Sequence, residues 1–93
     1  MAGFTTISST QLSANGDVFA GSARVKSIYV AHSASAGTVV LKTGGSTGTT
    51  ICTINTAAVL GEYQTDIPQP GLRCSNPHIT FGGGVSFVTV FYD

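Results

Sequence analysis

The sequence predicts an all-β fold, a small antiparallel β-sandwich or jelly roll of seven to eight short strands. Short runs of β-branched and aromatic residues recur along the chain, and turn residues separate them at spacings of about ten residues. No stretch combines the length and the hydrophobic periodicity of a stable α-helix. The best candidate, Ala57 to Leu60, would give a single turn. Ninety-three residues are enough for one domain with a small core.

The strongest strand signal is the run from Val85 to Tyr92, which follows the glycines at 82–84. Because side chains alternate across a strand, Phe87 and Phe91 fall on one face and two valines fall on the other. Both faces are therefore apolar. This pattern indicates either a central strand or a strand whose second face is covered by another copy of the protein.

The rest of the chain divides into an amino-terminal segment and a single sandwich domain. Residues 1–20 are expected to be an extended arm, packed partly on a neighbouring subunit, or an ordinary first strand. Residues 21–93 are expected to form the β-sandwich. Its further strands are predicted at Arg24 to His32, Thr38 to Thr43, Thr49 to Asn55, Glu62 to Ile67, Leu72 to Cys74 and His78 to Phe81.

The first three of these strands are expected to form a meander, with Ser33 to Gly37 and Gly44 to Gly48 as loops. Alternation within the strands predicts which side chains are buried. The predicted core residues are Ile28, Val30, Val39, Leu41, Ile54, Tyr63, Ile67, Ile79, Phe81, Val88 and Val90.

Charge is scarce in this sequence. Charged residues make up 9% of the chain, against roughly 25% in typical globular proteins. So few charges do little to keep a monomer dispersed, which predicts that much of the surface is covered in an assembly. The net charge is zero and no basic patch is visible, so no nucleic acid partner is expected.

The amino terminus lacks the basic region and apolar core of a signal peptide, and no apolar run approaches the roughly 20 residues that span a bilayer. We therefore expect synthesis in the cytoplasm and no membrane partner. Cys52 and Cys74 are then expected to be reduced and packed in the interior.

No motif specifies a reaction, so neither enzyme activity nor a cofactor is expected. The sequence spacings between His32, His78 and the four carboxylates match no metal-binding motif, which argues against a metal site. A triad of Ser33 or Cys52 with His78 and Asp66 is conceivable, but no nucleophile elbow is present.

Apolar and aromatic residues at the two ends of the chain form the candidate assembly interface. They are Phe4, Ile7, Leu12, Phe19, Phe87, Phe91 and Tyr92. Aromatic residues gathered on one exposed face would also suit a carbohydrate-binding platform.

Several stretches resemble small β-structured virion proteins of tailed bacteriophages, of the type found in marine phages and cyanophages. The stretches are Arg24 to Val30, Ser35 to Lys42, the turn Gly44 to Gly48, Pro70 to Arg73, and Val88 to Tyr92. Proteins of this family look like structural parts of the virion, which decorate the head or belong to the tail and its fibres.

The resemblance implies a virion location. Together with the scarce charge and the two apolar faces of the last strand, it leads to a first hypothesis, a head decoration or cement protein that forms a homotrimer or higher oligomer. This protein would bind the major capsid protein in many copies, partly through Met1 to Gly21. The alternative is a tail or fibre module that contacts a host receptor or glycan. It would use the loops Ser33 to Gly37, Gly44 to Gly48 and Ser75 to Pro77. A secreted carbohydrate-binding domain is a third possibility, which the missing signal peptide disfavours.

Overall fold

The computed structural model describes residues 7–68 and 71–93 of the chain. Within these residues it has seven strands in one antiparallel sheet and no helix, which confirms the predicted all-β class. The strands are β1 (Ser8–Leu12), β2 (Gly16–Asp17), β3 (Ser22–Thr43), β4 (Thr49–Thr56), β5 (Gly61–Asp66), β6 (Leu72–Ser75) and β7 (His78–Tyr92).

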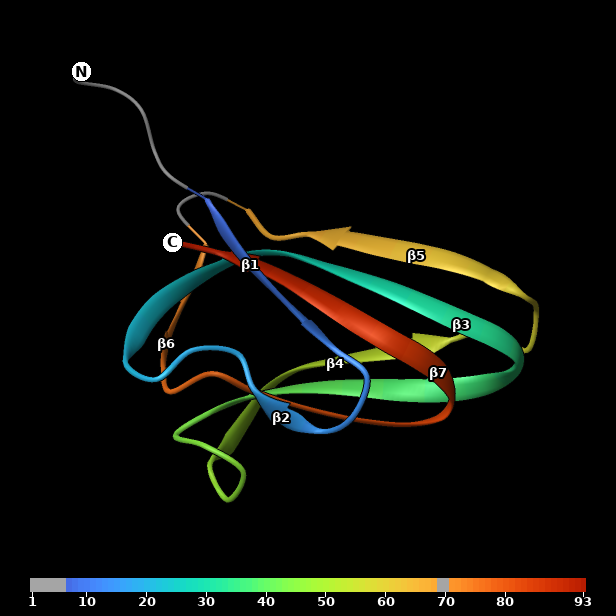
Figure 1. The fold of residues 1–93 in the computed structure, drawn as a ribbon, viewed down its shortest axis with the longest axis horizontal. Coiled ribbons are helices and arrows are strands. Elements are labelled where there is room, and N and C mark those ends of the chain that lie inside the picture. Colours follow the sequence, from blue (N-terminus) through green and yellow to red (C-terminus); the bar gives the residue numbers. More distant parts are fainter. Residues whose placement is uncertain (1–6, 69–70) are drawn as a thin grey trace.

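Two long strands, β3 and β7, form a ribbon that carries the rest of the sheet (Figure 1). They run antiparallel and pair from Val25 opposite Tyr92 to Lys42 opposite His78. About halfway along, both strands bend, so that the ribbon folds back over itself. Each of the other five strands pairs with β3 or β7.

The folded ribbon divides the sheet into two half-sheets. The first contains residues 22–32 of β3 and 85–92 of β7, with β1 beside β7 and with β5 and β6 beside β3. The second contains residues 37–43 of β3 and 78–83 of β7, with β2 beside β7 and β4 beside β3. One cluster of buried side chains fills the space between them. This arrangement of two facing layers is that of a small β-sandwich.

The two strands take paths of different length through the bend. Between its paired residues His32 and Gly37, β3 has four residues, whereas β7 has only Gly84. Strand β3 therefore follows the outer path and β7 the inner one.

The inner path requires residues without side chains. A Cβ atom at Gly84 would lie 1.9 Å from the carbonyl oxygen of Ser35, and one at Gly83 would lie 2.5 Å from that of Ala36. Gly83 also has a φ of 68°, a backbone conformation that residues with a side chain rarely adopt. Gly83 and Gly84 thus allow the two strands to approach closely at the bend.

The predicted strand boundaries are wrong at this bend. Arg24 to His32 and Thr38 to Thr43 are parts of the single strand β3, so Ser33 to Gly37 is not a loop. The predicted meander therefore reduces to one hairpin, between β3 and β4. His78 to Phe81 and Val85 to Tyr92 are likewise parts of β7. Glycine and other small residues bend these strands without ending them.

Most of the predicted core is buried. The eight buried members are Ile28, Val30, Val39, Leu41, Ile54, Ile79, Val88 and Val90. Ile67 and Phe81 are only half-buried against this cluster. The side chain of Tyr63 lies outside the described part of the structure.

Alternation alone missed part of the core. Regular alternation along a strand would place Val25 and Ile28 on opposite faces, yet both side chains are fully buried. The register of β3 with β7 shifts between Val25 and Ser27, and this irregularity brings both residues to the inner face. Further buried apolar residues outside the prediction are Val18, Ala23, Cys74 and Val85.

The amino-terminal segment contributes to the sheet and to the core. Strand β1 pairs with β7, from Ser8 opposite Tyr92 to Leu12 opposite Val88. Val18 is buried, and its amide donates a hydrogen bond to the carbonyl oxygen of Pro77 at 2.8 Å.

The bend provides a matched pair of glycine substitutions. Gly84→Ala should destabilise the fold by about 1–3 kcal/mol or more, because the added methyl group collides with backbone. Gly82→Ala should change stability by less than about 1 kcal/mol, since nothing lies within 4 Å of its Cβ position. Urea unfolding of both variants measures the difference, and equal stability of the two would contradict the close approach at Gly84.

Candidate functional site

The predicted interface residues fall into two groups on opposite faces of the first half-sheet. Phe87 and Phe91 lie half-buried on its outer face, since the neighbouring valines of β7 point into the core. Leu12 and Tyr92 instead pack against the core cluster at the open edge beside β1. The structure therefore does not gather the predicted residues into a single patch.

The edge group is held together by ring contact and hydrogen bonding. The Phe19 and Tyr92 rings lie with centroids 5.4 Å apart and planes tilted by 42°. The Thr10 hydroxyl donates a hydrogen bond to the carbonyl oxygen of Val18 at 2.9 Å and lies 3.4 Å from the Tyr92 hydroxyl. Phe19 and Ile7 remain exposed. Phe4, the remaining predicted residue, lies outside the described residues.

The outer face of the first half-sheet carries a third aromatic residue that sequence analysis did not select. Tyr29 lies opposite Thr89 on the neighbouring strand, and Phe87 and Phe91 are two residues to either side of Thr89. Diagonal cross-strand neighbours of this kind are within reach of aromatic side chains. We call Tyr29, Phe87 and Phe91 the outer aromatic face.

Polar groups of β5 border this face. The Tyr29 hydroxyl donates a hydrogen bond to the Glu62 carboxylate, and this bond, with smaller contributions from burial and from the Glu62 charge, raises the pKa of Tyr29. The Ser27 hydroxyl donates to Asp66 at 3.2 Å, and the Gln64 amide donates to both of these side chains. The aromatic face is thus flanked by carboxylate and amide groups that can accept or donate hydrogen bonds.

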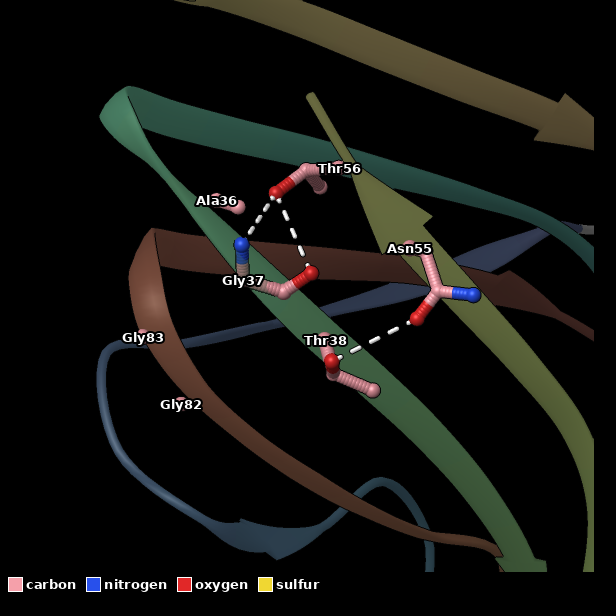
Figure 2. A pocket seen from close by; sticks show the side chains of 7 residues that line it. All are labelled: Ala36, Gly37, Thr38, Asn55, Thr56, Gly82 and Gly83. Atoms are coloured by element: carbon pink, nitrogen blue, oxygen red, sulfur yellow. Dashed lines mark hydrogen bonds between the residues drawn. The ribbon is translucent and has the colours of Figure 1, made fainter. Parts of the chain in front are cut away.

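A shallow pocket of about 460 Å³ lies at the bend. It is lined by Ala36, Gly37, Thr38, Asn55, Thr56, Gly82 and Gly83, as Figure 2 shows. The Thr56 hydroxyl accepts a hydrogen bond from the Gly37 amide at 2.9 Å, and the Thr38 hydroxyl donates to the Asn55 side-chain oxygen at 3.4 Å. Its lining offers hydroxyl and amide groups without charge.

Two of the three loops proposed for receptor contact meet at the end opposite the bend. The Gly44 amide donates to the carbonyl oxygen of Ser75 at 2.6 Å, and the Gly45 amide donates to that of Asn76 at 3.0 Å. Residues 33–37 lie at the bend instead (Figure 1). These segments therefore cannot contact one small ligand together.

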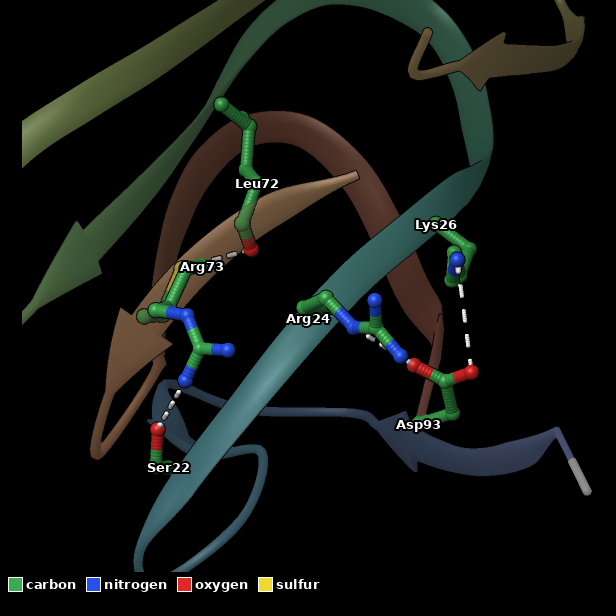
Figure 3. A network of polar contacts seen from close by, with 7 residues as sticks. Ser22, Arg24, Lys26, Leu72, Arg73 and Asp93 are labelled. Atoms are coloured by element: carbon green, nitrogen blue, oxygen red, sulfur yellow. Dashed lines mark hydrogen bonds and ion pairs between the residues drawn. The ribbon is translucent and has the colours of Figure 1, made fainter. Parts of the chain in front are cut away.

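Basic side chains gather where β3 begins, beside β6 and the end of β7 (Figure 3). The Asp93 carboxylate lies 3.3 Å from the Arg24 guanidinium and 4.0 Å from the Lys26 ammonium. Arg24 and Asp93 also exchange two backbone hydrogen bonds, of 2.8 and 3.0 Å. Arg73, which lies opposite Arg24 in the register of β3 and β6, donates to the Ser22 hydroxyl at 3.4 Å. This network joins the end of β7 to β3.

The histidines occupy separate positions. His78 Nδ1 lies 2.7 Å from an Asp17 carboxylate oxygen, which joins β7 to β2. His32 Nδ1 lies 3.2 Å from the carbonyl oxygen of Ser33. Asp66, the carboxylate considered for a triad, accepts a hydrogen bond from the Ser27 hydroxyl on β3. Within residues 7–68 and 71–93, no three potential ligands among His, Cys, Asp and Glu cluster in a way that would hold a metal ion.

The two cysteines are free and differ in exposure. Cys74 is buried in the core and Cys52 is half-buried on β4. Burial raises the pKa of the Cys74 thiol, which lowers the fraction of reactive thiolate at a given pH.

Comparison with known proteins identifies no relative. No family model matches the chain, and no curated protein or solved structure shows significant similarity to it. In the part of the chain that the structure describes, no helix is long and apolar enough to cross a membrane.

The difference between the thiols gives a testable pH dependence. In the folded protein, iodoacetamide should alkylate Cys52 well before Cys74, and Cys74 should react slowly until the pH exceeds the ordinary thiol pKa. Because the unfolded chain ionises Cys74 at lower pH than the folded chain, this residue lowers stability as the pH rises through that range. Mass spectrometry of peptides after timed alkylation checks the order, and faster labelling of Cys74 would refute it.

Proposed function

We propose that this protein is a structural component of a bacteriophage virion, a head decoration protein that binds the capsid in many copies. The observation that carries the proposal is the outer aromatic face, formed by Tyr29, Phe87 and Phe91 on a domain with very few charges. Aromatic residues are enriched where proteins bind one another, and charged residues are depleted in the core of such contacts.

The small size of the domain supports the same function. A domain of 93 residues buries only a modest core, so contact with neighbouring subunits adds apolar burial that its own fold does not supply. Repetition on a lattice makes weak individual contacts sufficient for stable attachment. The phage-like stretches of the sequence point to the virion as that lattice.

The first test is whether the chain occurs in the particle. Mass spectrometry of purified virions from the phage that encodes the sequence should detect it in many copies, and antibodies against the full chain should label heads. Its absence from purified virions would reject the proposal.

The second test concerns the outer aromatic face. Purified chain is added to virions from a phage lacking the gene, and bound protein is measured after gradient sedimentation. The double variant Phe87→Ser, Phe91→Ser should bind at least about tenfold more weakly, since truncating a buried anchor typically costs about 2 kcal/mol or more.

The matched control is Val40→Ser, a half-buried apolar position of β3 outside this face, which should leave binding unchanged. Circular dichroism shows whether each variant remains folded. Equal binding of a folded double variant would reject the role of the outer aromatic face.

The bend pocket favours a second candidate, a tail or fibre module that contacts a host glycan. The Thr38 hydroxyl and the Asn55 side-chain amide in its lining are uncharged groups that hydrogen-bond sugar hydroxyls. Under this function the isolated chain binds host-cell glycans on an array, and Asn55→Ala removes the binding while Thr80→Ala keeps it. An array without any bound glycan rejects this candidate.

A further inference from the structure

Most free edges of the sheet carry features that oppose pairing with another strand. Strand β5 carries Glu62 and Asp66, and the four-residue strand β6 carries Arg73. Strand β2 has only two residues. Short strands and charged side chains are the means by which proteins keep sheet edges from pairing with other chains.

Strand β4 has neither protection. It is eight residues long, stands at the end of the strand order, and pairs with β3 alone among the described strands. No charged residue and no proline occur from Thr43 to Gly61, a segment that includes all of β4. Threonine and isoleucine dominate the strand, and these residues favour extended pairing.

Exposed apolar side chains accompany this edge. Three of the five exposed large hydrophobic residues in the described part of the chain are Ile51, Val59 and Leu60, with 37%, 65% and 76% of their surface exposed. Ile51 is within β4, and the other two follow it in the loop to β5.

The register of β4 identifies the part of the edge that is regular. Leu41 pairs with Cys52 but Lys42 pairs with Thr50, so Ile51 is an extra residue without a partner on β3. From Cys52 to Thr56 the pairing is continuous. This stretch presents a straight row of backbone donors and acceptors on its free side.

We propose that the free edge of β4 pairs antiparallel with β4 of a second copy of the chain. The segment from Thr43 to Gly61 has no charge that could pair with a charged partner strand. The same segment of a second copy is equally neutral, so its pairing with β4 leaves no charge without a partner. Antiparallel pairing about a twofold axis makes the contact self-complementary. It also brings the loop with Val59 and Leu60 of one copy toward the beginning of β4 in the other, where Ile51 is exposed.

This inference deepens the proposed function, on which it rests for the biological use of the contact, because it states how copies of a decoration protein join. A twofold contact gives a dimer or an assembly with an even number of copies. A trimer, the oligomer expected from the sequence, would contradict it.

The test is the solution mass of the full chain, measured by light scattering over a range of concentrations. Wild-type protein should form a dimer or an even-numbered assembly. Thr53→Lys places a charge on the regular part of the edge, and Leu60→Glu places one on the exposed loop, so each should raise the dissociation constant at least about tenfold.

Gln11→Lys is the matched control, since it adds the same charge at an exposed position of the edge strand β1 and should leave the mass unchanged. Circular dichroism confirms that each variant keeps its fold. A monomer at every concentration, an odd-numbered assembly, or unchanged association of both edge variants would overturn the proposal.

The outcome is separable from that of the proposed function. A dimer that loses its association in Thr53→Lys, from a chain that is absent from purified virions, would support the β4 contact and reject the virion role. A chain that is abundant in virions but monomeric in solution, with or without Thr53→Lys, would support the virion role and reject the β4 contact.

Discussion

The pairing of β3 with β7, folded over at a glycine-lined bend, is the constraint on which the whole domain depends. Both half-sheets are built on the same two strands, and the core lies between the two halves of one ribbon. Every other strand is attached to this ribbon. The bend requires backbone to approach backbone at Gly37, Gly83 and Gly84, so the positions that determine the two-layer fold are those that contribute no side chain.

Local pattern predicts the extended segments well because strand propensity is encoded within a few residues. The pattern does not show that two predicted strands are continuous, because glycine indicates a turn and a strand bend equally well. The irregular pairing near Val25 and Ser27 was also hidden from the local pattern. It changes which residues face inward, and it becomes visible only when the partner strand is known. Alternation did place Phe87 and Phe91 together on one face, and the structure shows that this face points outward.

The remaining parts of the candidate sites depend on pairing between distant segments. Tyr29 joins Phe87 and Phe91 only through the register of β3 with β7, about 60 residues apart in the sequence. The contact of Gly44 with Ser75 and the pocket at the bend also arise from long-range pairing. No short window of sequence contains this information.

The domain has few charges and two exposed uncharged surfaces, the outer aromatic face and the free edge of β4. The outer aromatic face suits contact with a different protein, and the uncharged edge of β4 suits contact with a second copy. These surfaces belong to different half-sheets. Under the proposed function, one subunit would therefore have separate surfaces for a neighbouring copy and for the capsid. A small domain with two independent contacts is suited to repetition over a surface.

Residue-resolved hydrogen exchange of the full chain, measured at low and at high protein concentration, tests this account most directly. Amides in the ladder between β3 and β7 should be the slowest to exchange at both concentrations, because they open only with the whole fold. Amides on the free edge of β4 should exchange quickly in dilute protein and slowly in concentrated protein. Rapid exchange along the ladder between β3 and β7, or rapid exchange of β4 at every concentration, would contradict the account.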